Sequence, residues 1–457
     1  MSNIGRRNRH RFAGLGAWFA LLYCAVDLAS AQSTPTGHVN GFDLTTRLAD
    51  YGIYFRAIAD AQAASNPIGG LRSGTRSEQY LYGGVDVDLQ KAIGWKGAKL
   101  HAHLLAETGH GLSAEAIGGG IDVQSSYSPF SLLRFLNLTL EQNLTLLRPD
   151  DLQLVAGRMG VTTYFARTEY SCEFMNKSFC NPAYGFSQNT GASTGVLATW
   201  AAKASLKTSD TTYSQIGVFA VDPATQLETT TLFDLSADMI RGATIVAESG
   251  YGTTFLNATF PSNFKLGAWY NTAPQNHALL NTAFESFVLK RGTRLTYTGG
   301  TGVYLVADQV LFRPDLSSKR NLALFATFHY AFHEGAPIRW LGKVGLVQTG
   351  TFGARDADTF GVAFSVTEFS AAEVAFFRDS RQRGGGTGVP YSNEFVLEAN
   401  YGYRFVPGVT ARPNIQYIVR PDPRYSSTTP SPIPNALVFG LELTVNFAEA
   451  LGMPRIP

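Results

Sequence analysis

The sequence of 457 residues is poor in charge, in cysteine and in long apolar runs. Asp, Glu, Lys and Arg make up 16% of it, against about 25% in ordinary soluble proteins. Beyond the N-terminus no stretch of about 18 consecutive apolar residues occurs, which excludes a helical membrane span. No basic stripe is present, so we expect no nucleic-acid partner. No Gly-rich segment has phosphate-loop spacing.

Glycine and aromatic residues are abundant instead. The chain has 46 Gly, 31 Phe and 20 Tyr, yet its mean hydropathy is only −0.03. A transmembrane β-barrel has this balance, because half of each strand faces lipid and the other half faces water.

Residues 1–31 are predicted to be a secretory signal peptide. Four arginines precede an apolar run over 12–26, and Ala29-Ser30-Ala31 supplies a cleavage motif. Removing 31 of the 457 residues leaves 426 and, because four Arg and one Asp are lost, changes the formal net charge from +2 to −1. We expect a lead-in over 32–44, one barrel domain over 45–447 and a C-terminal tail over 448–457.

Two cysteines remain after the signal, Cys172 and Cys180. An even number in an exported protein favours a disulfide, and closing so short a loop stabilises by about 2–3 kcal/mol. The alternative, a metal site with C-x7-C spacing, is disfavoured because no His is close.

Apolar and polar residues alternate with a period of two along the chain, as strands with two different faces require. The clearest apolar face is formed by Leu437, Phe439, Leu441, Leu443, Val445 and Phe447. A soluble β-sandwich also alternates, but here the charged faces carry small residues and aromatic residues cluster at strand ends. We therefore predict an all-β fold, a single-domain transmembrane antiparallel β-barrel in a bacterial outer membrane. Sixteen strands would use about 27 residues each.

Several segments, in their order along the chain, resemble the carbohydrate-selective porin family, the B-type outer-membrane porins of Gram-negative bacteria. They include GGLRSG at 69–74, EFMNKSFC at 173–180, GVYLVADQVLFRP at 302–314 and EFVLEANYGYRF at 394–405. The resemblance covers about residues 45–447 of this sequence. It implies a 16-stranded barrel that passes sugars by facilitated passive diffusion, with no catalytic step and no cofactor.

The candidate pore-lining residues are polar or aromatic side chains expected to face the lumen. A constriction must bind sugar hydroxyls weakly enough to release them, and Arg and carboxylate groups bond hydroxyls well. The predicted set is Arg72, Arg76, Glu78, Tyr80, Asp86, Glu141, Lys203, Trp269, Glu394, Glu398 and Arg404. The alternative is a generic lumen charge for Glu141, Lys203, Glu394, Glu398 and Arg404 and a solvated turn before the strand for Arg72 and Arg76.

Residues 174–180 are expected to fold into or over the pore, stiffened by the disulfide. His101 and His103 share one strand face with Glu107. We expect them to be ordinary lumen histidines and predict no metal site.

Other functions stay open at this stage. The main alternative is a porin for other small solutes, such as aromatic acids or anions, and an exported sugar-binding β-protein is another. A barrel enzyme is disfavoured, because Gly-x-Ser-x-Gly is absent and the histidines show no patterned partner. The expected partners are carbohydrate solutes and outer-membrane lipid, and association into a homo-oligomer is allowed.

Overall fold

The computed structural model describes residues 40–126, 133–180, 184–191, 198–226, 235–314, 317–421 and 432–457. The predicted signal peptide, and with it the cleavage site, lies outside these residues. The division into signal, lead-in, barrel and tail therefore stays a prediction.

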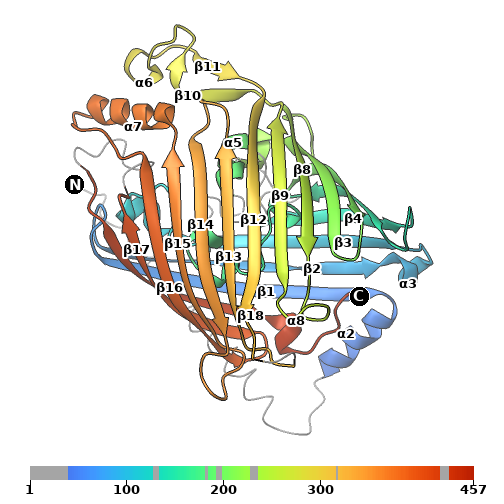
Figure 1. Cartoon of the computed structure of the whole chain (residues 1–457). Coiled ribbons are helices and arrows are strands. Elements are labelled where there is room, and N and C mark those ends of the chain that lie inside the picture. Colours follow the sequence, from blue (N-terminus) through green and yellow to red (C-terminus); the bar gives the residue numbers. More distant parts are fainter. Residues whose placement is uncertain are drawn as a thin grey trace, which may run out of the picture.

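Within the described residues, 16 antiparallel strands form one closed barrel (Figure 1). The strands are β1 (Ile53–Ile68), β2 (Gly74–Asp88), β3 (Ala98–Gly109), β4 (Leu133–Leu144), β5 (Leu152–Met159), β6 (Thr199–Lys207), β7 (Thr212–Val221), β8 (Gly242–Gly252), β9 (Ser262–Asn271), β12 (Gly300–Phe312), β13 (Asn321–Ala331), β14 (Ile338–Thr349), β15 (Thr359–Phe369), β16 (Asn393–Val406), β17 (Val409–Val419) and β18 (Ala436–Asn446). Each strand pairs with its neighbour in sequence, and β1 pairs with β18 to close the ring. Closure leaves no unpaired sheet edge. The prediction of a 16-stranded barrel is confirmed.

The outer surface of the barrel is apolar, as the alternation predicted. Large side chains on this face are exposed, for example Leu266 on β9, Leu397 on β16 and Phe439 on β18. The inner face carries buried polar residues at the intervening positions, such as Glu398 and Gln416. This inverted distribution suits a barrel with lipid outside and water inside.

The two ends of the barrel differ in their connections (Figure 1). One end carries the hairpin β10 (Gln275–Asn281) and β11 (Arg294–Tyr297), α6 (Phe287–Lys290) and α7 (Ala371–Arg383). The other carries α2 (Asn40–Asp50), α3 (Leu89–Ile93), α8 (Phe447–Ala450) and the C-terminus. We call these the loop end and the turn end. No described helix is both long and apolar enough to cross a bilayer.

Two connections from the loop end fold into the barrel. The first inner loop (residues 110–126) follows β3 and contains the π-helical turn η1 (Ser113–Ile117). The second inner loop (residues 160–180 and 184–191) follows β5 and contains η2 (Val161–Thr163), η3 (Ser171–Glu173), α4 (Lys177–Cys180) and α5 (Tyr184–Thr190). A further 3-10 turn, η4 (Pro223–Gln226), follows β7.

Candidate solute channel

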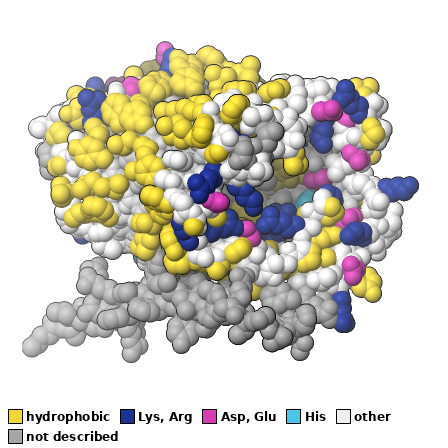
Figure 2. Space-filling view, turned by 60° about the horizontal axis from the view of Figure 1, so that its bottom comes forward, with side chains coloured by type: hydrophobic (Ala, Val, Ile, Leu, Met, Phe, Trp, Pro, Cys, Tyr) yellow, Lys and Arg dark blue, Asp and Glu magenta, His cyan; other side chains and the backbone are white. Residues whose placement is uncertain are grey.

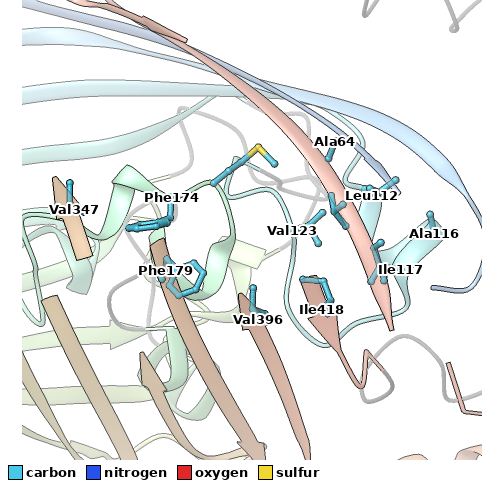
Figure 3. Close-up of a cluster of buried hydrophobic side chains, with 14 of the residues drawn as sticks. Ala64, Leu112, Ala116, Ile117, Val123, Phe174, Phe179, Val347, Val396 and Ile418 are labelled. Atoms are coloured by element: carbon cyan, nitrogen blue, oxygen red, sulfur yellow. The ribbon is translucent and has the colours of Figure 1, made fainter. Parts of the chain in front are cut away.

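Apolar side chains hold the two inner loops together inside the barrel (Figure 3). Leu112 and Ile117 of the first loop and Phe174 and Phe179 of the second belong to one buried cluster. The barrel wall contributes inward-facing apolar residues to the same cluster, among them Phe325, Val347, Val396, Ile418 and Val438. Burying this surface packs the loops against the β13–β18 side of the wall.

Glu394 of β16 anchors the first inner loop. Its Oε2 accepts a hydrogen bond from the backbone N–H of Gly120 at 2.7 Å, and the side chain is only 1% exposed. The hydroxyl of Tyr184 in the second loop donates to the Gly120 carbonyl at 3.3 Å. The carboxylate therefore supports the point where the two loops meet.

Glu398, four residues further along β16 and on the same face, anchors the second inner loop. Its two oxygens accept the backbone N–H groups of Met175 and Asn176 at 2.8 and 2.9 Å, and its exposed fraction is 0%. The Asn176 amide donates to Gln416 at 2.9 Å, and Gln416 donates to the Val123 carbonyl of the first loop at 2.9 Å. Buried backbone donors need such partners.

An ion pair joins the two inner loops. Lys177 Nζ lies 3.1 Å from Asp122 Oδ2, and the Lys177 N–H donates to the Asp122 carbonyl at 3.0 Å. Burial lowers the pKa of Lys177, but the interactions with Asp122, Tyr184 and Glu78 together outweigh this effect and raise the pKa above its usual value. Lys177 is therefore charged at neutral pH.

The predicted disulfide loop lies in this region. Cys172 and Cys180 are bonded to each other, and Phe174, Met175 and Phe179 between them are buried in the cluster shared with the wall. Lys343 of β14 donates to the Ser178 and Phe179 carbonyls at 3.1 and 2.7 Å. The segment is thus fixed to the wall as well as closed on itself.

Glu248 on β8 anchors the beginning of the second inner loop. It accepts hydrogen bonds from the Ala166 N–H at 2.8 Å and from the side chains of Tyr213, Gln215 and Tyr304 at 2.7–2.9 Å. Sequence analysis did not select Glu248. Its inward position in β8 could have marked it as a lumen residue. The residues that it binds lie far away in the sequence, so its role as an anchor could not be predicted.

Three of the predicted pore residues face inward but are covered by the inner loops. Glu394 and Glu398 lie beneath the inner loops, where their oxygens bind backbone N–H groups. Trp269 faces inward as predicted, but only 4% of it is exposed because Phe186 of α5 covers the ring, with centroids 5.5 Å apart. In this arrangement none of the three offers a free face to a sugar.

Three predicted residues lie at the ends of the barrel. Arg72 is in the turn between β1 and β2, and Arg76 is on β2; their Nε atoms donate to Glu115 of η1, at 2.9 Å each. Arg404 lies at the turn end of β16 and pairs with Glu449 of α8. The arginines therefore hold an inner loop and the C-terminal helix.

The remaining predicted residues lie on the inner faces of β2, β4 and β6. Glu78 is buried, and its carboxylate has no hydrogen-bond partner among the described residues. Tyr80 is partly exposed.

Asp86 is bonded to His101 and His103 of β3, and Glu141 lies near His101. Lys203 donates to Gln153 at 2.7 Å and lies 4.5 Å from the Tyr164 ring of the second inner loop.

The turn end of the barrel is hollowed (Figure 2). Lys and Arg side chains border the hollow together with Asp and Glu, and a histidine lies at its edge, whereas apolar side chains cover the outer wall (Figure 2). A polar opening inside an apolar belt is the arrangement of a water-filled channel.

Comparisons with known proteins agree with this arrangement. The sequence model of the carbohydrate-selective porin, OprB family, matches residues 72–447. Porin B of Pseudomonas aeruginosa is 26% identical, over 88% of this chain and 89% of its own, and the putative porin QuiX of Acinetobacter baylyi is 24% identical, over 88% and 90%. A high-pH structure of Pseudomonas putida OprB superposes with a TM-score of 0.79 at 24% identity, over 88% of this chain and 96% of that one. Family and fold indicate a channel rather than an enzyme.

Proposed function

Because the chain belongs to the carbohydrate-selective porin, OprB family, we propose that sugars diffuse through this outer-membrane barrel along the part of its inner wall that the two inner loops leave uncovered. Diffusion of this kind needs no chemical step and no cofactor. The barrel supplies a wet path, and side chains along it exchange hydrogen bonds with the solute.

The observation that carries the proposal is the division of the inner wall into two parts. On the β13–β18 side, inward residues such as Val347 and Val396 are covered by the inner loops. On the β2–β4 side, inward residues such as Tyr82, His101 and Glu141 stay partly exposed. Water and solutes therefore have the polar β2–β4 side available to them.

We place the constriction where the second inner loop approaches β6. Tyr164 of that loop lies over Lys203, and the Arg167 carbonyl accepts a hydrogen bond from Lys265 of β9 at 2.8 Å. These contacts bring the loop directly against the wall, so the solute passes beside them, where aromatic and charged groups suit a sugar with an apolar ring face and polar hydroxyls. Among the predicted sugar contacts, Tyr80 and Glu141 lie on the open side.

Liposome swelling with a panel of monosaccharides, disaccharides and charged solutes tests the proposal. We expect neutral sugars to permeate, and Tyr164→Ala to increase the rate for disaccharides by removing the ring where the second inner loop meets β6. Tyr403→Ala is the matched control, because that ring is exposed on the outer face of β16. Failure of every sugar to permeate would refute the function, whereas equal rates for all solutes would refute selectivity.

Association of several copies is a further prediction that the sequence allowed. Chemical cross-linking in native outer membranes tests it, and a band only at the monomer mass would contradict it.

A further inference from the structure

We propose that Asp86, His101 and His103 form a binding site for a divalent transition-metal ion on the inner wall, near the turn end of the barrel. His101 Nδ1 and His103 Nε2 lie 2.6 and 2.8 Å from Asp86 Oδ1. One ligand atom from each of the three residues lies within 4.8 Å of the other two. The proposal is independent of sugar transport.

The sheet itself brings these residues together. His101 and His103 are two positions apart on β3, so their side chains point to the same face. Asp86 of β2 is the register partner of His101. The sequence-based expectation of no metal site considered only Glu107, which pairs with Tyr80 several residues further along the strands. The carboxylate comes from the neighbouring strand instead.

A glycine makes room for one of the imidazoles. Gly84 occupies the inward position of β2 between Tyr82 and Asp86. A Cβ atom at Gly84 would lie 2.2 Å from the Ala102 carbonyl oxygen and 2.7 Å from His103 Cδ2, closer than such atoms approach in proteins. Glycine at this position therefore lets the neighbouring strand and the imidazole of His103 lie close to β2, beside Asp86.

Each imidazole has its second nitrogen next to another polar group. His103 Nδ1 lies 3.0 Å from the Tyr82 hydroxyl, and His101 Nε2 lies 3.6 Å from Glu141 Oε2. A histidine that binds a metal almost always donates its other N–H group to a neighbouring oxygen. Both rings are thus oriented with one nitrogen toward Asp86 Oδ1 and the other toward a suitable oxygen.

The ligand set selects the class of ion. Two imidazoles and one carboxylate suit Zn²⁺, Ni²⁺ or Cu²⁺, whereas Ca²⁺ and Mg²⁺ prefer oxygen ligands. Three protein ligands leave a coordination position for water, and the side chain of His101 is partly exposed. Arg56 bonds the other oxygen of Asp86, and its own side chain is half exposed. Oδ1 of Asp86 therefore stays directed at the two rings.

Zinc binding by the full chain, purified in detergent without a polyhistidine tag and stripped with a chelator, tests the site. Isothermal titration should give one saturable Zn²⁺ per chain, weakened at least about tenfold by His101→Ala or His103→Ala and lost in the double variant. His110→Ala is the matched control, because this exposed histidine follows the other end of β3. The Zn²⁺ affinity of the His110→Ala variant should equal that of the wild type.

The alternative is that the two imidazoles only hydrogen-bond to Asp86. In that case the wild type shows no saturable Zn²⁺ binding, and the proposal is wrong; binding that persists in the double variant overturns it equally. His101→Gln and His103→Gln repeat the test should the alanine variants fail to fold. The heat-modifiable mobility of each variant on denaturing gels shows that its barrel is folded, so a loss of metal binding is distinguished from a loss of fold, and sugar-driven swelling is measured separately from both.

Discussion

Glu398 is the side chain whose removal should most clearly release the second inner loop. In Glu398→Ala the buried N–H groups of Met175 and Asn176 lose their only acceptor in the described structure. An unsatisfied buried donor costs about 1–3 kcal/mol, so two cost about 2–6 kcal/mol. Even 2 kcal/mol changes the ratio of docked to released loop about 30-fold. Glu398→Gln keeps one acceptor oxygen and should lose about half as much.

Single-channel conductance in planar bilayers measures this effect. We expect Glu398→Ala to show a larger and noisier conductance and a weaker reduction by added sugar, with Glu398→Gln between it and the wild type. Glu368→Gln is the matched control, because it removes the same charge from the neighbouring strand β15 at a partly exposed position. A folded Glu398→Ala barrel with wild-type conductance would refute the role of Glu398 as an anchor.

Three further predictions follow from the inner loops and the outer wall. Cys172→Ser with Cys180→Ser should increase conductance noise, because the closed segment loses its cross-link; wild-type conductance and sugar block would contradict this. Lys177→Met should raise conductance by leaving the buried Asp122 unpaired, and adding Asp122→Asn should partly restore it. The contribution of this ion pair is kept through neutral pH and is lost only as the pH rises through the raised pKa of Lys177. Leu346→Arg, on the outer face of β14, should cost about 2–4 kcal/mol if it lies near the bilayer midplane and reduce folding yield in urea titrations, whereas Leu346→Met should not.

The barrel could be predicted from the sequence because its signal is local. Each strand repeats every two residues, so the exposed outer positions of Phe439 and Leu441 follow from their neighbours alone. The same rule correctly assigned Glu394, Glu398 and Trp269 to the inner face. It gave the direction in which each side chain points and no more.

The inner loops could not be predicted in detail because their partners are distant in sequence. Glu398 binds Met175 and Asn176 across more than two hundred residues, and no period or motif records such a pairing. Trp269 was expected to meet a sugar, yet it meets Phe186 of α5. A lumen position is available to a solute only where no loop covers it, and that depends on the tertiary fold.

The composition of the inner wall nevertheless indicates which part of it the loops cover. Exposing apolar side chains to a water-filled lumen is unfavourable, so an inward apolar residue needs another apolar surface to cover it. Inward positions of β13, β14 and β16–β18 include Phe325, Val347, Val396, Ile418 and Val438, and all of these contribute to the cluster that holds the inner loops. Inward positions of β2 are instead Arg76, Glu78, Tyr80, Tyr82, Gly84 and Asp86. Strand parity identifies the inner face, and the polarity of that face then separates the wall that supports the loops from the wall that meets water.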